Sequence, residues 1–355
     1  MDPVTQGLLG ATAAGLAADR ERLPAAAFVG ALAGMAPDAD VLIRSSTDPL
    51  LFLEYHRHFT HSLVFIPVGA LICAALFHPV MRRWLRFRES LLFCLLGYAT
   101  HAVLDACTTY GTQLFWPFSD QRVAWNWISV VDPLFTVPAL ALLAVALWRR
   151  ARRPIMVAAL WMGLYMGVGV LQHDRAEAAG RALAATRGHA AEDLSAKPSF
   201  GNLVVWKTIY AEAGRFHVDA VRVGLGTTTY AGETAERLDL PRHIPWLDPA
   251  SQQARDVERF RWFSSDYLAV RPGRPDEVVD VRYSLVPNEI DPLWGIRLRR
   301  DAPADAHVTY FAARDADADA RRAFLAMYLG NPLPDTPREL AAPAVPASAG
   351  EQAAQ

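Results

Sequence analysis

One stretch decides the fold, because it joins a cluster of histidines to a long apolar run. It reads Tyr55-His56-Arg57-His58-Phe59-Thr60-His61-Ser62, and apolar residues continue from there to Val80. Three of the ten histidines in the chain fall within six residues of this stretch. Imidazole is the commonest metal-binding side chain, and metal ligands must converge on one ion. The stretch therefore predicts a metal site at the mouth of a hydrophobic helix.

The two halves of the 355-residue chain differ in composition. Up to residue 172 alanine, leucine, valine, glycine and phenylalanine dominate, whereas charged and strand-forming residues are interspersed beyond residue 173. The net charge of −2 and the lack of a basic stripe predict no nucleic-acid partner. The three cysteines lack paired spacing, so we interpret them as core residues.

The first half contains about six apolar segments, which predict an α-helical polytopic membrane bundle. They cover residues 4–18, 24–35, 62–80, 90–107, 130–148 and 155–172. The first two fall short of the roughly 20 residues that cross a bilayer, so full spanning stays open for them. Their glycines would let helices approach closely. An all-helical soluble protein is the alternative for this half.

Arginine-rich loops orient the bundle, because such loops stay on the cytoplasmic side. The strong markers are residues 82–88 and 149–153, and Arg20 with Arg22 forms a weaker third. All three agree with a multi-pass protein of the bacterial inner membrane whose second half is extracytoplasmic. Met1-Asp2-Pro3 lacks the basic region of a cleavable signal peptide.

The second half predicts a β-rich α+β domain. We expect a helix at 175–188, strands at 202–212, 215–224, 259–270, 277–286, 293–299 and 307–313, and a helix at 316–329. The domain boundaries that follow are a membrane-embedded domain over 1–174, an extracytoplasmic domain over 175–330, and a disordered Pro/Ala-rich tail over 331–355.

Ionisable residues inside or beside apolar segments are costly and usually functional. They are Asp2, Asp38, Asp40, His56, His58, His61, His101, Asp105, Asp132 and His173. On the six-segment topology every one of them falls at the same, outer end of the bundle. His101 and Asp105 are four residues apart, so a helix places both on one face. This coincidence predicts one shared site.

Carboxylate oxygens mixed with imidazole suit zinc, manganese or iron, and more than four candidates suggest two or more ions. The expected metal ligands are His56, His61, His101, Asp105, Asp38, Asp40 and Asp2. Zn²⁺ is the first choice and Mn²⁺ the second. An ion held in this way would acidify a bound water and polarise a phosphoryl oxygen, which is hydrolase chemistry.

The catalytic candidates have structural alternatives that stay open. Asp132 or an unbound carboxylate such as Asp40 would manage the proton, yet Asp132 before Pro133 is also a good helix cap. Arg57 would contact an anionic substrate, as would Arg122, or each would only pair with neighbouring aspartates. His58 and His173 are equally compatible with exposed loop or helix-end positions.

Five ordered motifs carry a family resemblance: Asp2-Pro3-Val4-Thr5-Gln6, Pro37-Asp38-Ala39-Asp40, His56 to Ser62, His101-Ala102-Val103-Leu104-Asp105 and Thr109-Tyr110-Gly111-Thr112-Gln113. They resemble the YdjM-like inner-membrane metal-dependent hydrolases, the LexA-binding, membrane-associated group, and the likeness continues to Thr136. Two departures stand out: many relatives carry His where Gln6 stands, and the position of His58 is not a fixed histidine.

The family is distantly similar to zinc-dependent phospholipase C and P1 nucleases, through the His-x-x-x-Asp of His101 and Asp105. By analogy this implies hydrolysis of a phosphoester. We therefore expect a membrane-bound, metal-dependent hydrolase of a lipid or lipid-linked phosphoester. A metal-handling or transport protein using the same cluster is one alternative, and a non-catalytic envelope assembly factor is another.

Overall fold

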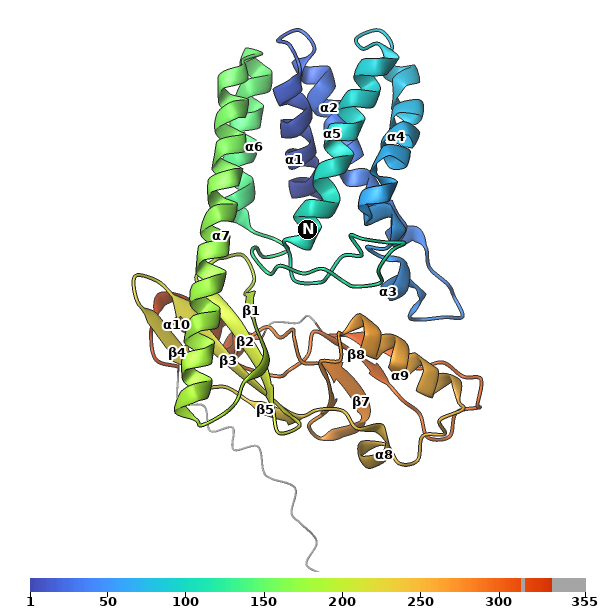
Figure 1. Ribbon diagram of the computed structural model, residues 1–355, viewed down its shortest axis with the longest axis vertical. Coiled ribbons are helices and arrows are strands. Elements are labelled where there is room, and N and C mark those ends of the chain that lie inside the picture. Colours follow the sequence, from blue (N-terminus) through green and yellow to red (C-terminus); the bar gives the residue numbers. More distant parts are fainter. Residues whose placement is uncertain (314–316, 334–355) are drawn as a thin grey trace, which may run out of the picture.

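The computed structural model describes residues 1–313 and 317–333, which form a helical bundle and a β-rich part (Figure 1). One long helix, α7 (Arg152–Thr186), runs from the bundle alongside the β-rich part. The tail expected over 331–355 lies, from residue 334 onward, outside the described residues.

The six expected helical segments are all present. They are α1 (Pro3–Ala17), α2 (Leu23–Met35), α4 (Ile66–Met81), α5 (Phe87–Ala106), α6 (Pro133–Arg149) and α7. Short helices lie between α2 and α4, namely η1 (Ala36–Leu42), α3 (Leu51–Tyr55), η2 (Phe59–His61) and η3 (Leu63–Phe65). Aspartates cap two of the long helices: Asp2 accepts from the Thr5 amide at α1, and Asp132 accepts from two amides at α6.

Small residues let the inner helices pack backbone to backbone, as the composition predicted. A methyl group added at Gly97 of α5 would stand 2.3 Å from the carbonyl oxygen of Gly30 in α2. The outer helices instead expose apolar side chains, such as Leu76 of α4 (68% exposed) and Leu164 of α7 (61%). An apolar surface of this kind suits contact with lipid.

Three helical stretches among the described residues are long and apolar enough to cross a membrane: Leu23–Leu42, Leu63–Met81 and Arg152–Thr186. The first joins α2 to η1, and α6 is apolar but shorter. These helices support association with a membrane. The arginine-rich connections α1–α2, α4–α5 and α6–α7 lie at the end of the bundle away from the β-rich part (Figure 1). The side of the membrane on which each end lies stays a prediction.

The β-rich part contains two antiparallel sheets. In the first, β1 (Glu192–Pro198), β2 (Val205–Glu212), β3 (Arg215–Val223) and β4 (Thr227–Tyr230) pair in chain order, and β5 (Thr234–Glu236) also pairs with β3. The second runs β6 (Leu268–Arg271), β7 (Arg274–Asp280), β8 (Trp294–Arg297) and β9 (Thr309–Ala312). The lower part of α7 packs on the first sheet, where Ala176 contacts a core that includes Trp206.

The strand expected over 259–270 is wrong in its first part, because α9 (Gln252–Phe263) occupies it. Ser251 caps this helix by accepting from the Ala254 amide, and Val257, Phe260 and Phe263 recur at helical spacing on its buried face. The strands β1, β4 and β5 were not predicted from the sequence. The helices α8 (Leu240–His243) and α10 (Ala318–Leu329) complete this part, and α10 agrees with the expected terminal helix.

Candidate metal centre

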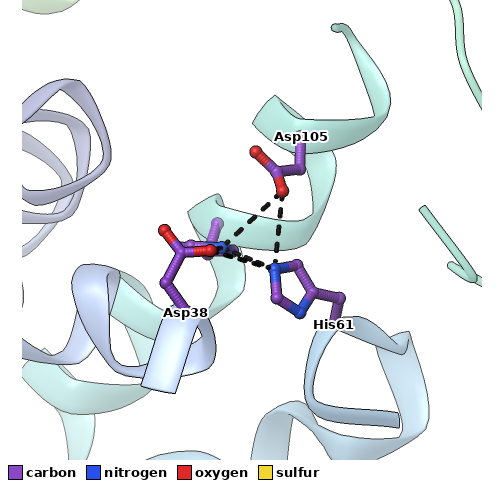
Figure 2. Close-up of side chains that lie close together, drawn as sticks. Asp38, His61 and Asp105 are labelled. Carbon is purple, nitrogen blue, oxygen red and sulfur yellow. Dashed lines mark hydrogen bonds and ion pairs between the residues drawn. The ribbon is translucent and has the colours of Figure 1, made fainter. Parts of the chain in front are cut away.

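Four ionisable side chains converge at the end of the bundle that faces the β-rich part. His101 lies in the last turns of α5. Figure 2 shows Asp38 from η1, His61 from η2 and Asp105 from α5 pointing toward one another. Each offers a ligand atom within 4.8 Å of the others. Both histidines and Asp105 are fully buried, whereas the Asp38 side chain stays 20% exposed.

The spacing of the ligand atoms suits one small cation. The Nε2 atoms of His61 and His101 are 2.9 Å apart. The Asp38 Oδ1 lies 3.5 Å from each of them, and the Asp105 Oδ2 lies 3.4 and 3.9 Å away. Donors bonded to one tetrahedral ion at about 2.0–2.1 Å stand roughly 3.3–3.4 Å apart. The observed distances bracket that value.

Both imidazole rings are held by their other nitrogen. The Nδ1 of His101 lies 2.5 Å from the Gly34 carbonyl oxygen. The Nδ1 of His61 lies 3.0 Å from the Thr60 hydroxyl and 3.2 Å from the Asp40 Oδ2. An acceptor at Nδ1 fixes the proton there and leaves the Nε2 lone pair for a metal. Each ring is therefore oriented as a ligand.

Asp40 is buried and accepts from several donors at once. Its carboxylate contacts the Arg57 amide (3.0 Å), the Thr60 hydroxyl (2.8 Å), the His56 Nδ1 (2.8 Å) and His61. This arrangement orients the neighbouring histidines. Asp38, Asp40 and His56 also form a second group within 4.8 Å, so the two groups share Asp38.

Asp105 is surrounded by donors but keeps one oxygen without a hydrogen bond. Its Oδ1 accepts from the Gln6 side-chain amide at 2.8 Å and contacts the Met1 amino group. Its Oδ2 forms an ion pair with the Arg57 Nε at 3.0 Å, yet no described donor is hydrogen-bonded to it. The Oε1 of Gln6 is likewise buried with no described partner. Orphaned acceptor oxygens at this corner fit a bound cation.

The charges around His61 also favour a bound cation. Burial alone would lower the pKa of His61, but the nearby carboxylates of Asp105, Asp38 and Asp40 raise it to about 10. The cluster therefore stabilises positive charge, and its residues fit a divalent metal.

The first half of the chain is similar to a known protein family. Residues 1–176 match the family model described as YdjM inner membrane protein. These residues, termed the YdjM region, are thus similar to the YdjM inner membrane proteins. All four converging side chains lie within the YdjM region.

Two curated proteins are similar to parts of the chain. The inner membrane protein YbcI of Escherichia coli (strain K12) is 38% identical over 110 residues, which is 29% of this chain and 60% of that protein. The uncharacterized protein YfhP of Bacillus subtilis (strain 168) is 32% identical over 133 residues, which is 36% of this chain and 38% of that protein. The chain thus spans less than two thirds of either relative. No solved structure matches.

Several predicted site residues of the YdjM region lie outside both groups. Asp2 caps α1 through Thr5 and lines the adjacent cavity. Asp132 accepts from the Tyr165 hydroxyl and the α6 amides, and burial raises its pKa although those bonds oppose the shift. His58 packs against Trp116, and His173 lies near Glu177 on α7.

A cavity of about 500 Å³ adjoins the cluster between the bundle and the β-rich part. Asp38, His56 and Arg57 form its polar corner. Its remaining walls are mainly apolar and include Val41, Leu53, Val131, Phe263 and Trp294. The cavity therefore combines charged and apolar walls.

Arg122 lines the same cavity and is incompletely paired. Its Nη2 donates to the Gly111 carbonyl at 3.0 Å, and its guanidinium stacks 5.0 Å from the Phe263 ring centroid. Its shielded Nε and Nη1 have no hydrogen-bond acceptor among the described residues. Burial lowers the pKa of Arg122 to about 9. An anionic group in the cavity would satisfy these donors.

Sequence reasoning missed the groups that hold the ligands. The Gly34 carbonyl carries no residue-type signal, since any residue supplies it. The orienting contacts of Asp40 were also not foreseen, although its position in Pro37-Asp38-Ala39-Asp40, close to the histidine stretch in sequence, was a usable hint.

Proposed function

We propose that this protein is a membrane-bound, metal-dependent hydrolase that cleaves a phosphoester of a lipid or lipid-linked substrate. The observation that carries the proposal is the convergence of two imidazole Nε2 atoms and two carboxylate oxygens, with both rings held at Nδ1. Asp38, His61, His101 and Asp105 would hold the first ion, and Asp38, Asp40 and His56 a second. The mixed nitrogen and oxygen donors at tetrahedral spacing favour Zn²⁺, with Mn²⁺ as the alternative.

A metal bound there supplies a water of lowered pKa and an electrophile for a phosphoryl oxygen. The protein's residues position that chemistry. Asp40 fixes the His61 ring, and Arg57 balances the charge of Asp105. When only the first group holds an ion, His56 is not a metal ligand. Asp40 then orients its ring through Nδ1, and its Nε2 would accept or donate a proton. We favour His56 over Asp132 for this role because His56 lines the cavity and Asp132 does not.

The cavity supports an amphipathic, anionic substrate. Its apolar walls would take hydrocarbon, and the unpaired donors of Arg122 would bind phosphate oxygens beside Asp38. A phospholipid or a lipid-linked phosphate combines both parts. The arginine-rich loops favour an extracytoplasmic site, which such a substrate reaches from the outer leaflet.

The first test is metal content of the purified full-length protein in detergent. We expect at least one equivalent of zinc or manganese in the wild type and its loss in His101→Ala and Asp105→Asn. His78→Ala is the matched control, because His78 lies on α4 and contacts Ser90, away from the cluster. A wild type that binds neither ion after loading would overturn the proposal.

The second test is hydrolysis of phospholipids in vesicles by the metal-loaded protein. We expect release of the phosphorylated headgroup or of phosphate, with loss of activity in His61→Ala. Metal binding without hydrolysis of any phosphoester would favour the metal-handling alternative. A reporter fused after Gly188 tests the orientation, and a cytoplasmic signal would contradict it.

A further inference from the structure

Lysine is scarce in this chain, and its two lysines lie together. Of 35 lysine and arginine residues only two are lysines, Lys197 and Lys207. They lie directly opposite each other on the antiparallel strands β1 and β2. Both are buried, with 6% and 4% of their surface exposed. Both belong to the half of the chain that the YdjM family model does not cover.

Such a pair is unfavourable unless something compensates it. Like charges directly opposite each other destabilise a sheet, and a buried ammonium group loses its hydration. Accordingly, burial lowers the pKa of each lysine to about 7. Lysine can respond in this way, whereas a buried arginine keeps its charge. Neutral side chains would hold the strands together at lower cost, so packing alone does not account for the pair.

The partners of the two lysines are mostly neutral. The Nζ of Lys197 donates to the Asn126 side-chain oxygen at 3.1 Å and lies 5.9 Å from the centroid of the Tyr283 ring. Only one of its three hydrogens thus has a hydrogen-bond acceptor among the described residues. The Nζ of Lys207 donates to Ser284 (2.7 Å) and to the Glu289 carbonyl (2.8 Å).

The acid that attracts both lysines is already occupied. Asp280 attracts both lysines, but it forms an ion pair with Arg282 at 2.7 Å. Arg282 repels Lys197, whereas Glu233 and Glu289 also attract Lys207. Positive charge on Lys197 is therefore poorly compensated.

A small cavity of about 100 Å³ adjoins this group, with room for a few water molecules. It lies where the first sheet meets the loop that follows α5. Its lining includes Lys197, Lys207, Arg282, Ser129, Ser199 and Ser284. Arg282 is paired with Asp280, and the Ser284 hydroxyl donates to the Val286 carbonyl. The two ammonium groups, with the hydroxyl groups of Ser129 and Ser199, form a donor set for a compact oxyanion.

We propose that this cavity, the lysine chamber, binds a phosphate group through the Nζ atoms of Lys197 and Lys207. Two ammonium groups can balance the charge of a phosphate dianion. A phosphate group also fits a cavity of this size better than a nucleotide does. The group is either free inorganic phosphate or the phosphate of a lipid headgroup. The proposal is independent of the metal centre and of hydrolysis.

The scarcity of lysine makes the test direct. Full-length protein labelled with ¹⁵N at lysine Nζ and placed in phosphatidylcholine nanodiscs has only two labelled side chains. We expect inorganic phosphate, titrated at constant ionic strength, to move both Nζ signals toward the ammonium form with saturation. Chloride at the same ionic strength should leave them unchanged.

Nanodiscs containing phosphatidic acid separate the two sources. Saturation by free phosphate assigns the free ion, and a shift only with phosphatidic acid assigns a headgroup. Either result supports the chamber. If neither probe moves the signals, or if chloride moves them equally, the proposal is overturned.

Variants supply a second measurement. Lys197→Gln and Lys207→Gln should each weaken phosphate binding roughly ten- to hundred-fold, as expected for loss of a charged hydrogen bond. Arg215→Gln is the matched control, because it removes a cation from an exposed position of the same sheet. If a glutamine variant fails to fold, the wild-type titration still decides the question. Unchanged phosphate affinity in two folded glutamine variants would contradict the assignment.

Discussion

The metal centre and the lysine chamber are both buried polar sites, but they have opposite charge. At the metal centre, carboxylates surround two imidazoles, and Arg57 with Gln6 satisfies part of their charge. In the lysine chamber two ammonium groups face neutral oxygens and one carboxylate that is already paired. Each region retains polar atoms that the protein itself does not satisfy. The sign of the uncompensated charge is therefore what separates the two proposals, a cation at the metal centre and an anion in the lysine chamber.

We expect the largest effect, a loss of folding stability, when metal is removed from the metal centre. Stripping metal from the wild type should lower its stability by roughly 4 kcal/mol where the free ion had exceeded its Kd about a thousand-fold. Thermal unfolding with and without chelator measures this. The His101→Ala variant should show no chelator effect, whereas Lys197→Gln should keep it. A chelator effect that survives in His101→Ala would place the ion elsewhere.

Replacing both lysines should stabilise the protein in phosphate-free buffer. In the double variant Lys197→Met, Lys207→Met the apolar stems are retained and two buried charges are removed, so we expect a gain of about 1–3 kcal/mol. Chemical unfolding of the detergent-solubilised protein gives the value. Phosphate should stabilise the wild type and leave this variant unaffected. A clear loss of stability would mean that the ammonium hydrogen bonds outweigh the charge burial.

Loss of an orienting contact at the metal centre should have an intermediate effect. Asp40→Asn weakens the acceptor at the His61 Nδ1 but leaves the converging ligands in place, so metal affinity should fall about ten- to hundred-fold. Competition with a metal indicator measures the affinity. Asp19→Asn, at an exposed loop, is the control and should bind normally. An affinity equal to wild type in Asp40→Asn would assign Asp40 no orienting role.

The last test is the pH dependence that the two lysines contribute to stability. The pKa of each lysine is about 7 in the folded protein and near its ordinary value when unfolded. Between pH 7 and 9 the unfolded state therefore holds more protons, and stability should rise by about 1.4 kcal/mol per pH unit for each lysine. The Lys197→Met, Lys207→Met variant should lose this slope. An equal slope in that variant would assign it to other groups.

The sequence predicted the bundle better than the β-rich part. Apolar length and the position of charged residues are local features, so six helices and the convergence of His101 with Asp105 followed from them. The helix over 252–263 was missed because Phe260 and Phe263 resemble strand residues when the Ser251 cap is not recognised. The lysine pair depends on the register of β1 with β2, which residue types alone do not determine.

The helix α7 is continuous, and its length sets how far the first sheet lies from the top of the bundle. The helix contains 35 residues and is therefore roughly 50 Å long. A bilayer would take up about 20 of these residues, whereas the lower part of the helix lies along the first sheet (Figure 1). Because a continuous helix is stiff, α7 would hold the β-rich part at a constant height above the hydrocarbon if its apolar half spans the bilayer.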